Sequence, residues 1–166
     1  MGSQHQFIMA IEIFSKVLTA AEITASLGKE PTLFWDRGDV DFRGRRQSHS
    51  KWRLDSGRPY DAPLESHLRR LFSLWPKGGT ARLRKLDFRS AALIRVAAIY
   101  KTYTCTVSLS PKWVQRIAAE GLELQVSSLP GGSNRSHARI SAWLRESGLA
   151  LEHGRRASKR RPKLGK

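Results

Sequence analysis

The sequence contains little that would place it outside the cytoplasm. Its single cysteine, Cys105, cannot form a disulfide within the chain, which fits a reducing compartment. No apolar run approaches the roughly 18–20 residues that a membrane-spanning helix requires. The N-terminal stretch lacks the basic region of a signal peptide, and Glu12 interrupts its apolar residues. We therefore expect a soluble, cytoplasmic protein that does not enter a membrane.

Acidic residues are also scarce. The chain has 14 Asp and Glu against 30 Lys and Arg, which gives a net charge of +16. Residues 135–166 carry ten of these bases against only Glu146 and Glu152, so about half of the excess lies in the last fifth of the chain. Two interpretations of this basic tail remain open. It is either an electrostatic contact for phosphate or another polyanion, or a solubilising extension without a ligand.

Hydrophobic residues make up 40% of the 166 residues, which is enough for one core. Residues 64–75 show the clearest pattern, because their apolar side chains recur along one face of a helix. Alternation, apolar runs and capping residues indicate further elements. The expected strands are residues 7–14, 51–55, 91–100, 103–110 and 122–129, and the expected helices are residues 20–27, 64–75 and 111–120.

This order, β-α-β-α-β-β-α-β, predicts an α+β fold with a mixed or antiparallel sheet and helices packed against it. From about residue 50 it matches the β-α-β-β-α-β order of a ferredoxin-like sheet. Only a few residues separate strands 91–100 and 103–110, so we expect a hairpin there. Cys105 falls on the apolar face of the second strand, which favours a packed core thiol over a nucleophile.

The composition changes at the sequence PGGS, which begins at Pro130. We place a domain boundary there, with an α+β domain at residues 1–130 and a basic extension at 131–166. Within the extension, residues 136–147 fit a short amphipathic helix, and the remainder is predicted to be disordered. The apolar face of that helix would consist of Ile140, Trp143 and Leu144.

The segment 29–42, KEPTLFWDRGDVDF, combines aromatic and acidic residues between two predicted elements. Pro31 prevents the preceding helix from continuing, and Gly38 permits a tight turn. We interpret the segment as a conformational corner in which Phe34 and Trp35 seal the end of the core.

The carboxylates of this corner, Asp36, Asp39 and Asp41, are also candidates for acid catalysis, which needs two acids about 5–9 Å apart. The neighbouring arginines argue against it, because a cation beside a carboxylate lowers its pKa and makes it a poor general acid. We instead expect Asp36 or Asp39 to accept hydrogen bonds from nearby backbone N–H groups. An enzyme that uses one of these acids is the third hypothesis.

The residues of a metal or cofactor site do not occur at suitable spacing. The histidines are scattered, whereas zinc sites pair Cys and His at short intervals. The acids of the corner do not follow a calcium loop, and neither a phosphate-binding loop nor a serine elbow is present. We expect no metal, no cofactor and no catalytic residue. The histidines are His5, His49, His67, His137 and His153.

Nucleic-acid binding has more support, because basic residues form three clusters. Trp35, Trp52 and Tyr60 would stack on bases if they were exposed. Since no nucleic-acid-binding signature occurs, such binding would depend mainly on phosphate contacts. The candidate polyanion-binding residues are Arg43, Arg45, Arg46, Arg82, Arg84, Lys85, Arg155, Arg156, Lys159, Arg160, Arg161 and Lys163.

Several motifs follow one another along the chain: LTAAEITASLGKEPT, a tryptophan, a Gly-Asp pair, KWRL, the apolar helix at 64–75, and SLSPKWVQRIAAEGLELQV. In this order they resemble the bacterial domain of unknown function 4279 family over about residues 7–129. The motif positions that we assign to structure are Pro31, Trp35, Gly38, Asp39 and Trp52. The family has no agreed activity, and the basic extension is not expected from its core. By analogy, small bacterial α/β families of this type include immunity proteins encoded beside toxins.

The preferred hypothesis is therefore a non-catalytic module that binds an unidentified protein partner, in a bacterial toxin–immunity or defence setting. The alternative is a nucleic-acid- or ribosome-associated protein that binds the phosphate backbone through its basic loops and tail.

Overall fold

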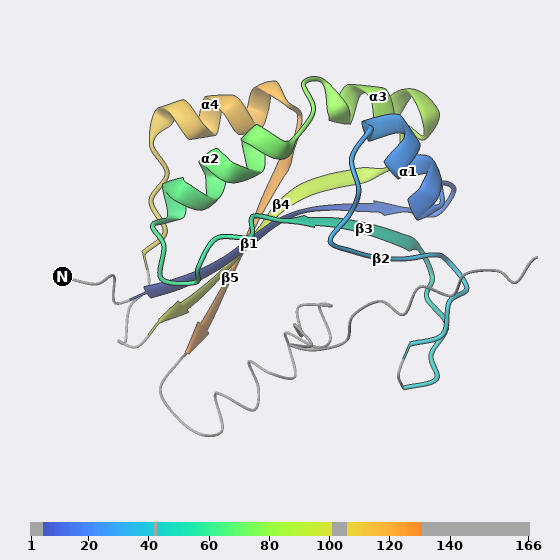
Figure 1. Cartoon of the computed structure of the whole chain (residues 1–166), viewed down its shortest axis with the longest axis horizontal. Coiled ribbons are helices and arrows are strands. Elements are labelled where there is room, and N and C mark those ends of the chain that lie inside the picture. Colours follow the sequence, from blue (N-terminus) through green and yellow to red (C-terminus); the bar gives the residue numbers. More distant parts are fainter. Residues whose placement is uncertain (1–4, 42, 101–105, 131–166) are drawn as a thin grey trace, which may run out of the picture.

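A computed structural model describes residues 5–41, 43–100 and 106–130 of the chain. These residues form the elements β1, α1, β2, β3, α2, α3, β4, α4 and β5 in chain order (Figure 1). The strands are β1 His5–Ser15, β2 Leu33–Trp35, β3 Ser50–Asp55, β4 Ala91–Tyr100 and β5 Glu123–Pro130. The helices are α1 Ala20–Leu27, α2 Leu64–Leu74, α3 Gly79–Leu86 and α4 Pro111–Ala119.

The five strands form one sheet in the order β2-β3-β1-β4-β5. The central strand, β1, pairs antiparallel with both β3 and β4. At the edges, β2 pairs antiparallel with β3, and β5 pairs parallel with β4. Figure 1 shows all four helices on one side of this sheet. The predicted α+β class with a mixed sheet is confirmed.

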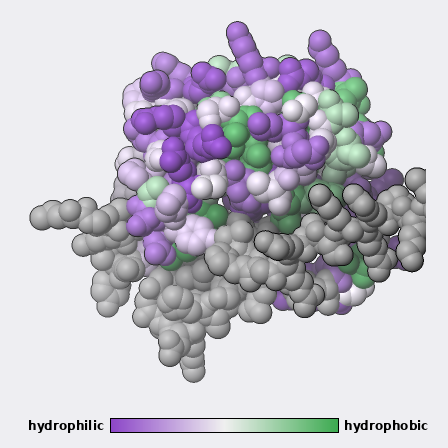
Figure 2. Space-filling model, viewed as in Figure 1, coloured by the Kyte–Doolittle hydropathy of each residue, from purple (hydrophilic) through white to green (hydrophobic). Residues whose placement is uncertain are grey.

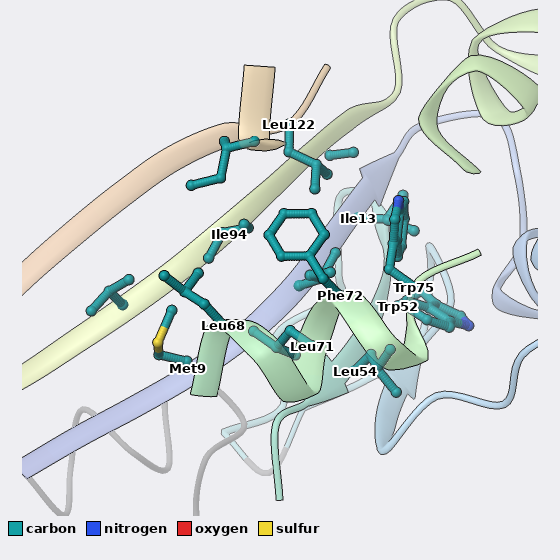
Figure 3. Packing of buried hydrophobic residues seen from close by; sticks show 14 of the residues in the cluster. Met9, Ile13, Trp52, Leu54, Leu68, Leu71, Phe72, Trp75, Ile94 and Leu122 are labelled. Atoms are coloured by element: carbon teal, nitrogen blue, oxygen red, sulfur yellow. The ribbon is translucent and has the colours of Figure 1, made fainter. Parts of the chain in front are cut away.

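The hydrophobic core lies between the sheet and the helices. Leu68 and Leu71 on the apolar stripe of α2 are fully buried, and Figure 3 shows them near Met9 of β1. Trp52 of β3 belongs to the same cluster, and its ring meets the ring of Trp75 edge to face, with centroids 6.5 Å apart. The apolar residues whose periodicity predicted α2 and β3 are thus the ones that form this core.

Helix α1 begins and ends as its sequence indicates. Thr19 and Glu22 form a capping box, in which the Thr19 side chain accepts from the Glu22 N–H at 3.2 Å and the Glu22 carboxylate accepts from the Thr19 N–H at 2.7 Å. Gly28 then ends the helix with a φ of 64°, in the left-handed region where glycine has no Cβ to strain.

The strand predicted at residues 103–110 is wrong over residues 106–110, the part of it that the structure describes. Residues 106–110 form no strand, and both edges of β4 are already paired, one with β1 and the other with β5. The alternating apolar residues Val107 and Leu109 instead pack against the core from the connection that leads into α4. Because β1 also separates β3 from β4, the chain after residue 50 does not form a ferredoxin-like sheet of its own.

Two observed elements were not expected from the sequence. The three-residue strand β2 lies within the segment that we interpreted as a corner, and it is too short to show an alternation. Helix α3 occupies a stretch without a predicted conformation. It follows Gly78, which has a φ of 68°, and no side chain caps its N-terminus, so the usual start signal is missing.

Some predictions lie outside the described residues. Cys105 is among them, and so is the whole extension at 131–166 with its predicted helix at 136–147. Within the described part of the chain, none of the helices combines the length and the apolar character needed to cross a membrane.

Candidate functional site

The corner extends past residue 42 as far as β3, so the name now covers residues 29–49, and its part after β2 folds back on itself through backbone hydrogen bonds. Gly38, with a φ of 95°, donates its N–H to the carbonyl of Gln47 at 2.9 Å, and Gln47 donates to the carbonyl of Asp39 at 2.8 Å. The turn predicted at Gly38 is therefore confirmed. Phe34, by contrast, is 59% exposed, so its predicted role in sealing the core is wrong.

The three carboxylates of the corner all accept hydrogen bonds from backbone N–H groups. Asp36 accepts from Ala20 at the start of α1 at 2.6 Å, and Asp39 accepts from Asp36 at 2.8 Å, as predicted. Asp41 accepts from the N–H and the Nε of Arg45 at 2.9 and 3.0 Å. The backbone N–H of Arg45 is the main cause that lowers the pKa of Asp41. An acid of this kind stays ionised near neutral pH, which does not suit a general acid.

The two described basic clusters are exposed but lie apart. One is on the corner, and the other is on α3, where Arg82 donates to the carbonyl of Ser26 at 3.2 Å and Arg84 to that of Gly121 at 3.2 Å. Figure 1 shows the corner and α3 on opposite sides of the sheet, so the fold does not join them into one surface. The exposed members are Arg43, Arg45, Arg46, Arg82, Arg84 and Lys85; the third cluster, Arg155 to Lys163, lies outside the described residues.

The aromatic residues considered for base stacking occupy different environments. Trp52 is fully buried and donates its indole N–H to the hydroxyl of Thr24 at 3.1 Å, so it cannot reach a base. Trp35 is half-buried, and the Nζ of Lys51 lies 4.8 Å from its ring centre. Tyr60 is 42% exposed, so it is the most accessible of the three aromatic residues.

A buried charge cluster lies on the sheet face turned away from the helices, which we call the second face. Glu12 is 0% exposed, and its carboxylate lies 2.8 Å from the Nζ of Lys51, 2.8 Å from Arg53 and 2.7 Å from the Nε of Arg95. Strand pairing and alternation define the second face. On the three central strands it consists of Ile8, Ala10, Glu12, Phe14, Lys51, Arg53, Asp55, Ala91, Leu93, Arg95, Ala97 and Ile99.

The cations of this cluster have further neighbours. Arg53 donates from its Nε to Asp55 at 2.8 Å. The Lys51 ammonium lies 5.3 Å from the ring centre of Phe14, and burial is the main cause that lowers its pKa. Charges buried this deeply are tolerated because they are paired, and loss of Glu12 would remove the carboxylate that Lys51, Arg53 and Arg95 share. The cluster is therefore a structural device that favours one strand register.

The sequence did not identify the charge cluster. The alternation of KWRLD placed Lys51 and Arg53 on the polar side of a half-buried strand, yet both are buried. A usable signal was nevertheless present, because Glu12 interrupts the apolar run FIMAIEIF and Arg95 interrupts AALIRVAAIY. A single charge in a strand that is apolar on both faces indicates a partner on a neighbouring strand.

A buried serine–histidine pair connects the turn after β3 to α2. The hydroxyl of Ser56 lies 2.7 Å from the Nδ1 of His67, and both side chains are buried. Burial is also the main cause that lowers the pKa of His67, which favours the neutral ring. Because neither group reaches the surface, the pair stabilises this turn and does not form an open nucleophilic site.

Three exposed apolar residues lie on the two neighbouring segments where β1 ends and β4 begins. We call Val17, Leu86 and Phe88 the junction patch, and their exposed fractions are 68%, 56% and 76%. The hydroxyl of Ser15 accepts from the Val17 N–H at 3.0 Å and donates to Asp87 at 2.7 Å, which ties the two loops together. By comparison, Figure 2 shows a mainly hydrophilic surface over the described residues on the side in view. Large exposed apolar side chains on neighbouring segments are typical of interaction sites.

Among the described residues, no group of three or more His, Cys, Asp or Glu side chains is arranged to hold a metal ion.

Comparison with known proteins agrees with the resemblance of the motifs. The family model described as domain of unknown function (DUF4279) matches residues 5–129. No curated protein and no solved structure matches the chain.

Proposed function

Because the chain belongs to the DUF4279 family, whose description assigns no activity, we propose a function from the geometry of its surface: a non-catalytic module that binds another protein. The observation that carries the proposal is the junction patch, where Phe88 is 76% exposed and Val17 and Leu86 on the neighbouring segments are also exposed. The buried hydrogen bond between Ser15 and Asp87 connects the two segments that carry the patch and so restricts their motion relative to one another. A preformed apolar surface loses little conformational entropy on binding.

The chemistry of the patch also indicates its partner. The guanidinium of Arg89 lies 5.1 Å from the ring centre of Phe88. Aromatic and arginine side chains dominate the binding energy of many protein interfaces, usually at the centre of a contact. The net charge of +16 favours an acidic protein, since opposite charges speed encounter and exclude basic competitors.

The proposal includes a cytoplasmic location, which the single cysteine supports. It also includes the toxin–immunity or defence setting, which rests on analogy with small bacterial α/β families. In that setting the partner is one specific protein encoded beside this gene. An isolated gene whose product has no stable partner would contradict the toxin–immunity or defence setting. The protein-binding function has a separate test.

A crosslinking experiment with the full chain in its native cells tests the binding function. A photoreactive amino acid replaces Phe88 in one chain and Phe34, the exposed phenylalanine of β2, in a control chain. We expect position 88 to capture one acidic protein that position 34 does not. With that protein purified, Phe88→Ser should weaken binding by at least about 10-fold, or about 1.4 kcal/mol, and Phe34→Ser by less than about 2-fold. Equal losses in both variants would count against the patch.

The second candidate function is binding of nucleic acid or of the ribosome, which the exposed basic clusters favour. Binding of an arbitrary duplex should then weaken steeply between about 50 and 200 mM salt. We plot the logarithm of the binding constant against the logarithm of the salt concentration. Exchange of Arg43, Arg45 and Arg46 for serine should make the slope of this plot shallower by about 2–3 units, because each phosphate contact contributes about 0.9. Affinity that does not change with salt would exclude this function.

The third hypothesis, an enzyme that uses a carboxylate of the corner, makes a different prediction. Asp39→Asn would retain the fold and lose an activity. The hydrogen bond from the Asp36 N–H to Asp39 supports a structural role instead, so we expect the variant to lose stability.

A further inference from the structure

Strand β5 leaves an open edge on the sheet. It pairs with β4, and in the part of the chain that the structure describes no strand lies on its other side (Figure 1). Four residues in succession, from Glu123 to Val126, are exposed, so the strand is accessible on both of its faces. Because the outer side of an edge strand carries backbone N–H and C=O groups without ladder partners, β5 can accept a further strand there.

The devices that usually protect an edge strand do not occur in β5. Its pairing with β4 runs without a bulge from Glu123 to Pro130, and its one proline is the final residue. The strand contains neither Lys nor Arg. Natural proteins keep exposed edges apart with lysines, prolines, bulges or very short strands, and the opposite edge strand, β2, has only three residues. The edge of β5 is therefore suited to pairing with a strand of another chain.

The charges of the molecule indicate which strand that is. Glu123 is the only charged residue of β5, so an acidic segment would find no cation on this strand. A basic segment would be repelled by the net charge of +16. A second β5 strand meets neither obstacle. It lies within residues 117–134, the longest run of the chain without Lys or Arg, so two copies can pair here without bringing basic residues of the two strands together.

Two β5 strands are also complementary in sequence when they run antiparallel. Opposite residues of such a pair point to the same side of the sheet, so a two-fold axis has to pass through a residue position. An axis at Gln125 places Leu124 opposite Val126 of the second copy, which gives two apolar pairs across the axis. Both side chains are exposed on the side of the sheet that carries the core. The same axis places Glu123 opposite Ser127, so no like charges lie opposite each other.

We propose that β5 pairs antiparallel with β5 of a second copy of this chain, around a two-fold axis at Gln125. The two five-stranded sheets then join into one continuous sheet. The axis is perpendicular to the sheet, so the helices of both copies lie on the same side of it. A contact between two strand edges is small for a protein interface, and we expect a reversible dimer. The contact uses no residue of the junction patch and goes beyond the proposed function.

Sedimentation of the full chain, freed of nucleic acid, tests the association. We expect a shift from monomer to dimer between about 1 and 100 μM, and at lower protein concentration in about 0.5 M than in about 0.1 M salt, because salt screens the repulsion between two basic copies. Val126→Lys should raise the dimer dissociation constant at least about 10-fold, because it places a lysine on the pairing edge. The matched control, Val40→Lys, adds the same charge at another exposed valine and should change the constant by less than about 2-fold.

Disulfide crosslinking tests the position of the axis and remains informative if Val126→Lys does not fold. Cys105→Ser first removes the only native cysteine. In that background, Gln125→Cys places two thiols directly across the axis, so we expect diamide to oxidise them to a covalent dimer. Glu123→Cys on the same face of the strand is the control. Its two thiols would lie about 14 Å apart along the strand and should not form a disulfide with each other.

Four results would overturn the proposal. A chain that remains a monomer up to about 100 μM at both salt concentrations would show that β5 does not pair with a second copy. Association that weakens as salt rises would indicate a contact between opposite charges instead. Equal weakening by Val126→Lys and Val40→Lys would place the contact elsewhere on the molecule. Equal crosslinking at positions 123 and 125 would indicate random collisions without a two-fold axis at Gln125.

Discussion

The Nε of Arg95 lies 2.7 Å from Oε2 of Glu12, and the two residues belong to the paired strands β4 and β1. Each interrupts an otherwise apolar run, so the pair joins two charges that would both be unfavourable if buried alone. A shift of one residue in the pairing would turn one of the charges toward the hydrophobic core. The contact therefore favours the observed register over its neighbours.

The first prediction concerns Glu12. Glu12→Gln retains the shape of the side chain but leaves Lys51, Arg53 and Arg95 without their shared carboxylate. We expect a loss of about 3–5 kcal/mol in the free energy of unfolding, because the removal of one charge from a buried ionic cluster is costly. Urea unfolding measures the loss. Glu30→Gln, at an exposed position, should change stability by less than about 0.5 kcal/mol, and an equally small effect at Glu12 would disprove the role of the cluster.

The second prediction concerns the corner. Asp36→Ala removes the acceptor for the backbone N–H of Ala20, so the start of α1 loses a cap. We expect the unfolding free energy to fall by about 1 kcal/mol, the usual effect of a lost N-terminal cap. Thermal unfolding of this variant and of the control Asp61→Ala, at an exposed position without such a bond, provides the comparison. Equal stability of the two variants would refute the capping role.

The third prediction concerns pH. The hydrogen bond from Ser15 is the main cause that lowers the pKa of Asp87 from its ordinary 3.8. Below about pH 4 the unfolded chain takes up this proton before the folded protein does, so the stabilising contribution of Asp87 is present at neutral pH and is lost as pH falls through the folded pKa. Asp87→Asn should therefore be less stable than wild type at pH 6, with a smaller difference at pH 3, as measured by urea unfolding. A stability difference between Asp87→Asn and wild type that grows as the pH falls would contradict this prediction.

The fourth prediction concerns Gly79 at the start of α3. A Cβ at this position would lie 2.9 Å from the ring of the buried Trp75 and 3.1 Å from Leu27. Gly79→Ala should thus destabilise the protein by about 1–3 kcal/mol through overpacking, although alanine is the better helix former. The exposed Lys85→Ala in the same helix serves as the control in chemical unfolding. A stabilised Gly79→Ala would show that the tryptophan moves aside without cost.

Local pattern predicted most of the fold. The capping box of Thr19 and Glu22 located α1, and the apolar stripe of α2 located the helix that covers the sheet. Helix α3 could not be found in this way, because Gly78 and Gly79 at its start weaken helix propensity and no side chain caps it. Its packing against the rest of the fold, which a local pattern does not contain, stabilises it.

The candidate sites depended more strongly on long-range contacts. The corner was identified because Gly38 and its neighbouring acids act through hydrogen bonds that are mostly local. Burial of Lys51 and Arg53 could not be predicted from KWRLD, since it depends on Glu12 in a distant strand. The exposure of Phe88 could not be predicted from the sequence either, because a single aromatic residue in a polar stretch shows no periodicity.

The position of β1 at the centre of the sheet affects how the protein is made. Its residues pair with β4 from Phe14 and Ala91 to His5 and Tyr100, so β1 leaves the ribosome well before the strand with which it pairs. Until then the apolar run FIMAIEIF has one edge without its partner. Contacts this distant in sequence slow folding and expose aggregation-prone segments during synthesis. Completion of the sheet is therefore a late event in the synthesis of this chain.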